Sequence, residues 1–175
     1  MQVPLAPGLS DANNWNQPEY YETIQSADID GDEIAELLAR SADGIDVWKY
    51  DTSAQQWDPL PTCTRFSDSQ GWNATPAYYS TILFADIDGD NVAEAVGRGG
   101  EALYVWKYNP STQAWGEIGE LPDLSDNNTD TETDWSQPQY YITIVYGDLL
   151  GGQQELVIAR AKNGILTCNT IPVYP

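Results

Sequence analysis

The chain has 175 residues, of which 41% are apolar, enough to fill the core of one domain. It carries 27 acidic and seven basic residues, and the net charge of −20 argues against nucleic acid or an anionic membrane as a partner. Membrane insertion is not expected either, because no apolar run approaches the roughly 18 residues of a membrane span.

The location that suits this charge is extracellular or secreted. A strongly acidic chain is typical of cation-binding and extracellular proteins. Residues 1–10 lack the basic and apolar regions of a secretion signal, so we expect such a signal to be absent or removed.

The chain contains three copies of one unit. Each copy begins at a tryptophan, and the copies cover residues 15–60, 72–118 and 135–175. Residues 1–14 precede them and resemble the end of an earlier copy, since they share a pattern with residues 119–128. The polar stretches between copies differ in length, as surface loops do. We therefore treat residues 1–175 as a single repeat domain.

Each copy is built from short segments separated by turn residues. In the first copy these segments read YYETIQSADI, AELLAR, GIDVWKYD and QQWDPL. Apolar and polar residues alternate in the first and third segments, and AELLAR is a brief apolar run. No helical period persists for 10 or more residues. We predict an all-β fold in which each copy forms four antiparallel strands, repeated around an axis as the blades of a β-propeller. Another repeated all-β solenoid is the alternative.

The last copy lacks its fourth segment, since it fades after GILTCNT. The ends of the chain thus fall one strand out of step with the repeats. Residues 1–14 would supply a strand that closes a neighbouring blade. Propellers have about four to eight blades, so three repeats cannot close a ring alone. We expect self-association, most simply a dimer with about six blades. The alternative is that the chain is a piece of a larger propeller.

Two acidic loops are candidate metal sites. Both contain the sequence ADIDGD, and their carboxylates lie at positions 1, 3, 5 and 9 counted from its first aspartate. Ca²⁺ prefers six to eight such oxygen ligands. The first site would use Asp28, Asp30, Asp32, the carbonyl of Ile34 and Glu36. The second would use Asp86, Asp88, Asp90, the carbonyl of Val92 and Glu94. We expect two Ca²⁺ ions per chain, with a structural role.

Other interpretations of these loops fit less well. An EF-hand needs glycine at position 6 and glutamate at position 12, whereas position 12 is Ala39 or Gly97 here. Magnesium usually keeps several waters and avoids cages of protein oxygens. A solvated acidic turn without metal stays open. The third copy has Leu150 and Gly152 where carboxylates are expected and one residue fewer before Glu155, so no metal is expected there.

The stretches ADIDGDEIAELLAR and ADIDGDNVAEAVGR resemble the calcium-binding repeats of the FG-GAP/VCBS family. Such repeats occur in integrin α-chain propellers and in some fungal and bacterial lectins. The resemblance covers nearly the whole chain and implies a propeller fold, with calcium in the loop between the first two strands of a blade. The Phe-Gly and Gly-Ala-Pro signatures behind the family's name are absent, which leaves the functional branch open.

Aromatic and basic residues recur at the same register in the three copies. The candidate ligand-binding residues are Trp15, Trp72, Trp135, Tyr21, Tyr79, Tyr141, Arg40, Arg98 and Arg160. The rings could stack on sugars, or they could pack within and between blades, which we favour. The arginines could surround an axis and capture an anion such as a uronate, or they could form a repeated ion pair, which we also favour.

Cys63 and Cys168 could form a disulfide, an intermolecular link or two free thiols, and we favour free buried thiols.

No histidine is present, so the commonest general base is missing. The sequence favours a non-catalytic, calcium-stabilised binding module, with a glycan as the leading ligand and a protein partner as the alternative. An enzyme that cleaves polysaccharides is the third hypothesis.

Overall fold

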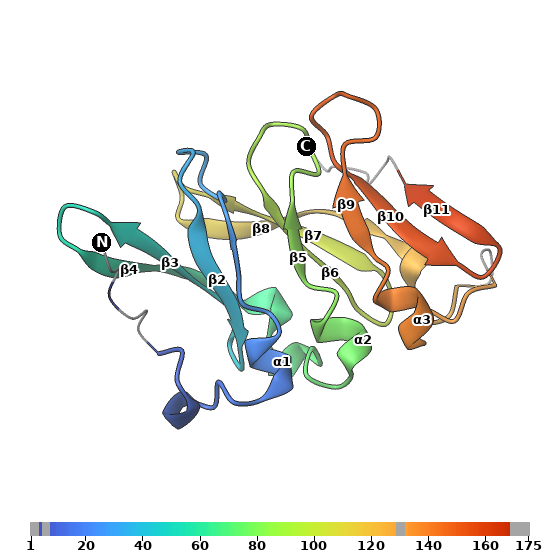
Figure 1. The fold of residues 1–175 in the computed structure, drawn as a ribbon, viewed down its shortest axis with the longest axis horizontal. Helices are drawn as coiled ribbons and strands as arrows, with labels where there is room; N and C mark the ends of the chain where they lie inside the picture. Colours follow the sequence, from blue (N-terminus) through green and yellow to red (C-terminus); the bar gives the residue numbers. More distant parts are fainter. Residues whose placement is uncertain (1–3, 5–7, 129–131, 169–175) are drawn as a thin grey trace.

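The computed structural model describes residue 4, residues 8–128 and residues 132–168. These residues form three antiparallel sheets that follow one another along the chain (Figure 1). The first sheet contains β1 (Gln25–Ala27), β2 (Glu36–Ser41), β3 (Gly44–Asp51) and β4 (Gln56–Cys63). The second contains β5 (Leu83–Ala85), β6 (Glu94–Arg98), β7 (Leu103–Asn109) and β8 (Ala114–Leu121). The third contains β9 (Val145–Gly147), β10 (Leu156–Ala161) and β11 (Gly164–Cys168).

Within each sheet the strands lie side by side in chain order, as in a propeller blade. The fourth segment of the first two copies is a strand, as the sequence predicts. No fourth strand joins β11 among the residues that the structure describes. The expected strand within residues 1–14 is not found in its described part, where Asp11–Asn13 forms the 3₁₀ turn η1. Residues 1–3 and 5–7 lie outside the described residues.

The first segment of each copy is only partly a strand, which corrects the prediction from its alternating pattern. Each segment opens with one helical turn, and these turns are α1 (Pro18–Tyr21), α2 (Pro76–Tyr79) and α3 (Pro138–Tyr141). Proline at the first helical position has its φ already set for a helix and lacks only an N–H that would be unpaired there. Strands β1, β5 and β9 retain three residues each. A single helical turn is too short to produce a detectable 3.6-residue period.

The core lies between the sheets. One apolar cluster contains Ile29 and Val47 of the first repeat together with Trp72 and Tyr104 of the second. An equivalent cluster joins the second repeat to the third. The turns after the fourth strands, η2 (Thr64–Phe66) with η3 (Asp68–Gln70) and later η4 (Pro122–Leu124), contribute the buried Phe66 and Leu124 to these clusters. Burial between neighbours is what makes the repeats one folded unit.

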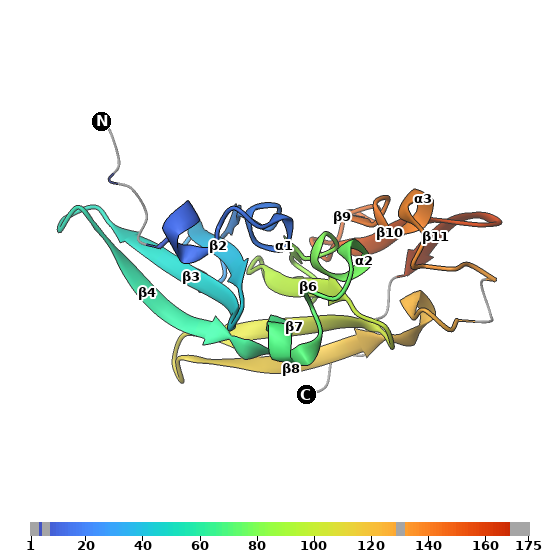
Figure 2. The same ribbon diagram turned by 90° about the horizontal axis from the view of Figure 1, so that it is seen from below.

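The two ends of the sheets differ in composition. The short helices lie at one end of the sheets, at the bottom of Figure 1, and the loops that join β1 to β2, β5 to β6 and β9 to β10 lie at the other end, at the top. Strands β4 and β8 lie on the side of the molecule away from the helices (Figure 2). Backbone hydrogen bonds link successive loops, from the N–H of Ala93 to Asp28 O at 2.8 Å and from the N–H of Glu155 to Asp86 O at 2.7 Å.

Candidate functional site

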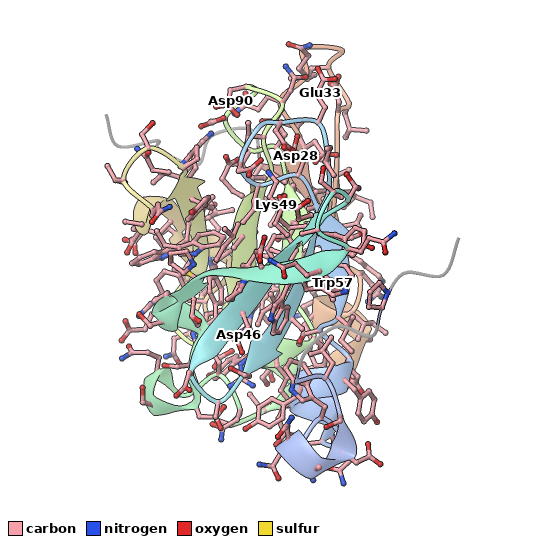
Figure 3. The ribbon with its side chains drawn as sticks, turned by 90° about the vertical axis from the view of Figure 1, so that its left-hand side faces the viewer. Asp28, Glu33, Asp46, Lys49, Trp57 and Asp90 are labelled. Carbon is pink, nitrogen blue, oxygen red and sulfur yellow. The ribbon has the colours of Figure 1, made fainter. Side chains whose placement is uncertain are left out.

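The acidic loops keep their shape by hydrogen bonds from the backbone to their aspartates. In the first loop, Asp28 accepts bonds from the N–H groups of Gly31 and Glu33, both at 2.7 Å. Gly31 and Glu33 have φ of 81° and 68°, a conformation that costs glycine little. Asp86 is held in the same way in the second loop. Asp28, Glu33 and Asp90 lie at the same end of the molecule, with Lys49 beneath Asp28 (Figure 3).

The carboxylates of each loop converge on one point. One oxygen from each of Asp28, Asp30 and Asp32 lies within 4.8 Å of the others, and the second loop has the same arrangement of Asp86, Asp88 and Asp90. Glu36 is fully buried beneath the first loop, and its Oε1 accepts no hydrogen bond from the described residues. These oxygens suit a Ca²⁺ ion. Coordination by the carbonyls of Ile34 and Val92 stays a prediction.

A lysine from the third strand also reaches each acidic loop, which the sequence interpretation missed. Nζ of Lys49 contacts Asp30 and lies 2.7 Å from Asp32 Oδ2 and 3.6 Å from Glu36 Oε1. Nζ of Lys107 lies 2.6 Å from Asp88 Oδ2 and 2.8 Å from Asp90 Oδ2. Part of the charge that would repel in these loops is therefore neutralised by the protein itself.

The pKa values of the loop carboxylates reflect this mixture of burial and charge. Burial raises the pKa of Glu94 to about 7 and raises the pKa of Glu36 as well. The hydrogen bond from Lys49 lowers the pKa of Asp32. Burial alone would raise the pKa of Asp90, but hydrogen bonds from Lys107 and from the N–H of Val92 hold it below its ordinary value. Burial thus dominates at the two buried glutamates, whereas hydrogen bonds outweigh burial at Asp32 and Asp90.

The third loop has the same length as the other two, which corrects the expectation of a missing residue. Leu156 pairs with Gly147 as Glu94 pairs with Ala85, so Leu156 takes the place of the buried glutamate. Glu155 instead lies at the register of Ala93, and its carboxylate accepts a bond from the N–H of Asp86 at 3.0 Å. Asp148 alone remains, and it accepts bonds from four backbone N–H groups. The third loop has lost the other carboxylate ligands.

Arg40 and Arg98 are fully buried structural residues, so they do not form an exposed anion site. Nε of Arg40 donates to Phe66 O at 2.7 Å, and the guanidinium pairs with Asp68. Nε of Arg98 donates to Leu124 O at 2.7 Å, and its guanidinium pairs with Asp126. Each arginine therefore binds the turn after the fourth strand of its own sheet. Arg160 is exposed.

A tyrosine completes each of these two clusters. Tyr20 donates to Asp68 Oδ2 at 2.8 Å, and Tyr78 donates to Asp126 Oδ2 at 2.7 Å. Burial, followed by this hydrogen bond, raises the pKa of Tyr20 to about 12. We call these the arginine clusters: Arg40–Asp68–Tyr20 in the first repeat and Arg98–Asp126–Tyr78 in the second.

Most of the recurrent rings are buried, as expected for packing within and between blades, and do not form exposed stacking platforms. Trp15, Trp72 and Trp135 are buried, and the Trp72 ring lies 4.6 Å from the Phe66 ring between their centroids. Tyr79 and Tyr141 are buried as well, whereas Tyr21 is exposed. These rings pack within and between sheets. Their regular recurrence reflects the repeated core.

One small cavity of about 160 Å³ combines aromatic and polar groups at the helix end of the second repeat. Its walls include Trp72, Tyr78 and Tyr104, with Gln70 and Glu101 at the exposed margin. Gly99 and Gly100 leave it open: a Cβ on Gly99 would lie 3.1 Å from the Tyr104 ring, and one on Gly100 would lie 2.8 Å from the Tyr78 hydroxyl.

This cavity depends on residues that only the second repeat has. The turn Gly99–Gly100 replaces Ser41–Ala42 of the first repeat and Ala161–Lys162 of the third. At the register of Tyr104 the other repeats carry Asp46 and Leu166. The sequence interpretation missed Gly99, Gly100, Glu101 and Tyr104. Their signal was divergence between repeats, because a residue that departs from the shared core pattern is free to serve a ligand.

Cys63 and Cys168 are free thiols, as favoured above, but only Cys63 is buried and Cys168 is half-buried. Burial raises the pKa of Cys63 to about 12. None of the helices in the described part of the chain is long and apolar enough to cross a membrane.

Comparison with solved structures identifies the fold. A lectin of Agrocybe aegerita, solved to explain specific recognition of non-reducing terminal N-acetylglucosamine, is similar with a TM-score of 0.64 and 16% identity. The chain has the fold of lectin propeller blades. This confirms the all-β propeller prediction. The match covers 85% of the chain and 36% of the lectin, so the chain spans about a third of that protein.

Other comparisons add little. A pore structure of the Photorhabdus luminescens Tc holotoxin matches with a TM-score of 0.47 and 16% identity, over 87% of the chain and 7% of the toxin. No protein-family model and no curated protein sequence matches the chain. Membership of the FG-GAP/VCBS family therefore stays a prediction.

Proposed function

We propose that the protein is a non-catalytic carbohydrate-binding module of the lectin type. The observation that carries the proposal is the cavity of the second repeat, where Trp72, Tyr78 and Tyr104 surround an opening that two glycines keep free. Trp72 and Tyr104 are only 3% and 7% exposed, so each offers a sugar only the small part of its ring that lines the cavity. That part suits the apolar face of a sugar ring, and Gln70 and Glu101 at the margin suit its hydroxyl groups. The lectin fold supports the same ligand class.

The ligand is a single sugar ring or the end of a glycan. The cavity of about 160 Å³ is smaller than the roughly 300–1,000 Å³ typical of pockets for drug-sized molecules. A terminal residue fits this size better than an extended chain. N-acetylglucosamine is the first probe, because it is the sugar recognised by the similar lectin.

Calcium would serve stability rather than chemistry. Asp28, Asp30, Asp32 and Glu36 would hold one ion, and Asp86, Asp88, Asp90 and Glu94 a second. A bound Ca²⁺ would neutralise these carboxylates and fix the loops. The loops lie at the end of the sheets opposite to the helices (Figure 1), whereas the cavity is lined by Tyr78 of helix α2. We therefore expect sugar binding that depends on calcium only through stability.

The test is titration calorimetry with N-acetylglucosamine, followed by a glycan array. The variant Gly99→Ser with Gly100→Ala gives the second repeat the turn of the first, which the fold already accepts there, and should abolish binding. The variant Ser41→Gly with Ala42→Gly makes the reverse exchange in the first repeat and should bind as the parent does. Unchanged affinity in the first variant would refute the cavity as the site.

A protein ligand and a polysaccharide-cleaving activity remain the two other hypotheses. A parent chain that binds no glycan on the array would remove the lectin function. Release of new reducing ends from acidic polysaccharides would show an enzyme instead. The absence of histidine from the chain favours binding over catalysis.

A further inference from the structure

The arginine cluster of the third repeat is incomplete. Arg160 occupies the register of Arg40 and Arg98, and its guanidinium lies 5.3 Å from the Tyr140 ring as theirs lie near Tyr20 and Tyr78. Its N–H donates to Thr143 Oγ1 at 2.9 Å, the equivalent of the bonds made by the other two. No carboxylate of residues 4, 8–128 or 132–168 pairs with it. The third repeat thus has the arginine and tyrosine but lacks the aspartate.

The turn that would supply this aspartate has a sequence counterpart at the other end of the chain. Leu9–Ser10–Asp11 matches Phe66–Ser67–Asp68 and Leu124–Ser125–Asp126, the turns that supply the aspartate in the first two repeats. Asp11 is exposed, and its carboxylate makes no hydrogen bond or ion pair within the described residues. Residues 9–11 thus have the sequence of the turns that bind Arg40 and Arg98, but Asp11 has no arginine partner among the described residues.

The N-terminal segment already lies where a preceding blade would end. Nε1 of Trp57 donates to Pro4 O at 3.0 Å, and Nε1 of Trp115 donates to Pro61 O at 2.8 Å. Pro4 precedes Asp11 by the same seven residues that separate Pro61 from Asp68. The first sheet therefore contacts this segment as the second sheet contacts the fourth strand of the first.

Apolar positions show the same two unmatched faces. Ile165 is 69% exposed, although its equivalents Ile45 and Leu103 are buried against the fourth strand of their own sheets. On the opposite side of the chain, Ile24 is 43% exposed, although its equivalents Ile82 and Ile144 are buried. Each face exposes residues that the fold buries wherever the neighbouring element is present.

We propose that these two faces bind each other between copies of the chain. The N-terminal segment of a second copy would lie along β11 and cover Ile165, and its Asp11 would pair with Arg160 and accept a hydrogen bond from Tyr140. One backbone hydrogen bond would also form across this contact. Ala35 occupies the register of Ala93 and Glu155, whose N–H groups donate to the preceding loop, so its N–H would donate to Asp148 O of the other copy.

The occupant is a second copy because the complementary residues belong to this chain. The faces differ, so the contact is head-to-tail, and such contacts form rings when the rotation closes. Two copies with three sheets each give six blades, within the usual four to eight. The opposite charges of Asp11 and Arg160 also select this pairing. The inference does not depend on glycan binding.

Sedimentation velocity on the 175-residue chain tests the proposal. We expect a species of twice the 19.4 kDa chain mass. Ile165→Glu should convert the dimer to single chains, because the substitution places a charge in the proposed interface. The matched control is Ile142→Glu. Ile142 is 66% exposed, but its equivalents Glu22 and Ser80 are exposed too, so Ile142 lies outside the interface and its substitution should leave the dimer intact.

Charge exchange tests the pair itself. Arg160→Glu and Asp11→Arg should each weaken the dimer at least tenfold, and the two substitutions in one chain should restore part of the loss, because the pair forms again with reversed charge. A parent chain that sediments only as a folded monomer would overturn the proposal, since residues after Cys168 or another protein would then cover the face. A dimer that resists Ile165→Glu, or open polymers instead of a closed pair, would also overturn it.

Discussion

Nζ of Lys107 lies 2.8 Å from Oε1 of Glu94, so an ammonium group of the protein reaches a carboxylate that has no exposed surface. Lys49 occupies the same position above Glu36 in the first repeat. In the sequence alignment of the repeats, Asn169 replaces this lysine in the third copy, whose loop keeps only Asp148 of the aligned carboxylates. The lysine is thus present where the full set of carboxylates is present, which fits one electrostatic unit.

The first prediction concerns calcium and stability. Excess Ca²⁺ should raise the melting temperature, because a ligand that binds only the native state stabilises by about 2.7 kcal/mol per site at 100 times its Kd. Differential scanning fluorimetry with Ca²⁺ and with EDTA measures the change. Asp86→Asn should lose about half of the response, and Asp148→Asn in the third loop should keep all of it. Equal melting temperatures in Ca²⁺ and EDTA would contradict the prediction.

The second prediction concerns Lys107. Lys107→Met keeps most of the apolar stem but removes the ammonium, which leaves three carboxylates without an internal counter-charge. We expect a lower melting temperature than the parent in EDTA and a larger increase on adding Ca²⁺, which then supplies the missing charge. Lys162→Met is the control, because the Lys162 side chain makes an exposed ion pair with Glu132. If Lys107→Met lowered the melting temperature equally in EDTA and in Ca²⁺, the metal would not be replacing the charge of the lysine.

The third prediction concerns the arginine cluster of the second repeat. Asp126→Asn leaves the buried guanidinium of Arg98 without its charge partner. The free energy of unfolding should fall by about 2 kcal/mol, less than the roughly 3–5 kcal/mol of a fully buried pair, because the Asp126 side chain is 28% exposed. Urea denaturation measures it, with Asp123→Asn in the preceding turn as control. Equal stability of the two variants would show that the pair contributes nothing.

The fourth prediction concerns the thiols. Cys63 is buried with a pKa of about 12, and burial raises the pKa of Cys168 to about 11. Since the thiolate is the reactive form, both should react with Ellman's reagent at pH 8 far more slowly than a free thiol of ordinary pKa. Two thiols per chain should be counted after unfolding in guanidinium. A count of zero without reductant would reveal a disulfide instead.

Much of the architecture was predictable because the repeats are local patterns. Alternating apolar residues predict β3 and β7, and the ADIDGD stretches predict loops whose aspartates bond to their own backbone. The one-turn helices were not predictable from periodicity, since four residues such as Pro18–Tyr21 do not complete a detectable period. Leu156 was misaligned for a related reason: only strand pairing shows that it, and not Glu155, takes the glutamate position.

The sequence by itself determined the repeat, its strands and the acid-rich loops, because these depend on neighbours within about ten residues. Only the tertiary structure decided which recurrent residues are buried. Trp72 and Arg98 lie inside because a neighbouring sheet or turn covers them, whereas Arg160, in the same pattern, stays exposed because no such turn covers it among the described residues. Burial depends on contacts between distant segments, so identical local patterns serve as core in one repeat and as an open surface in another.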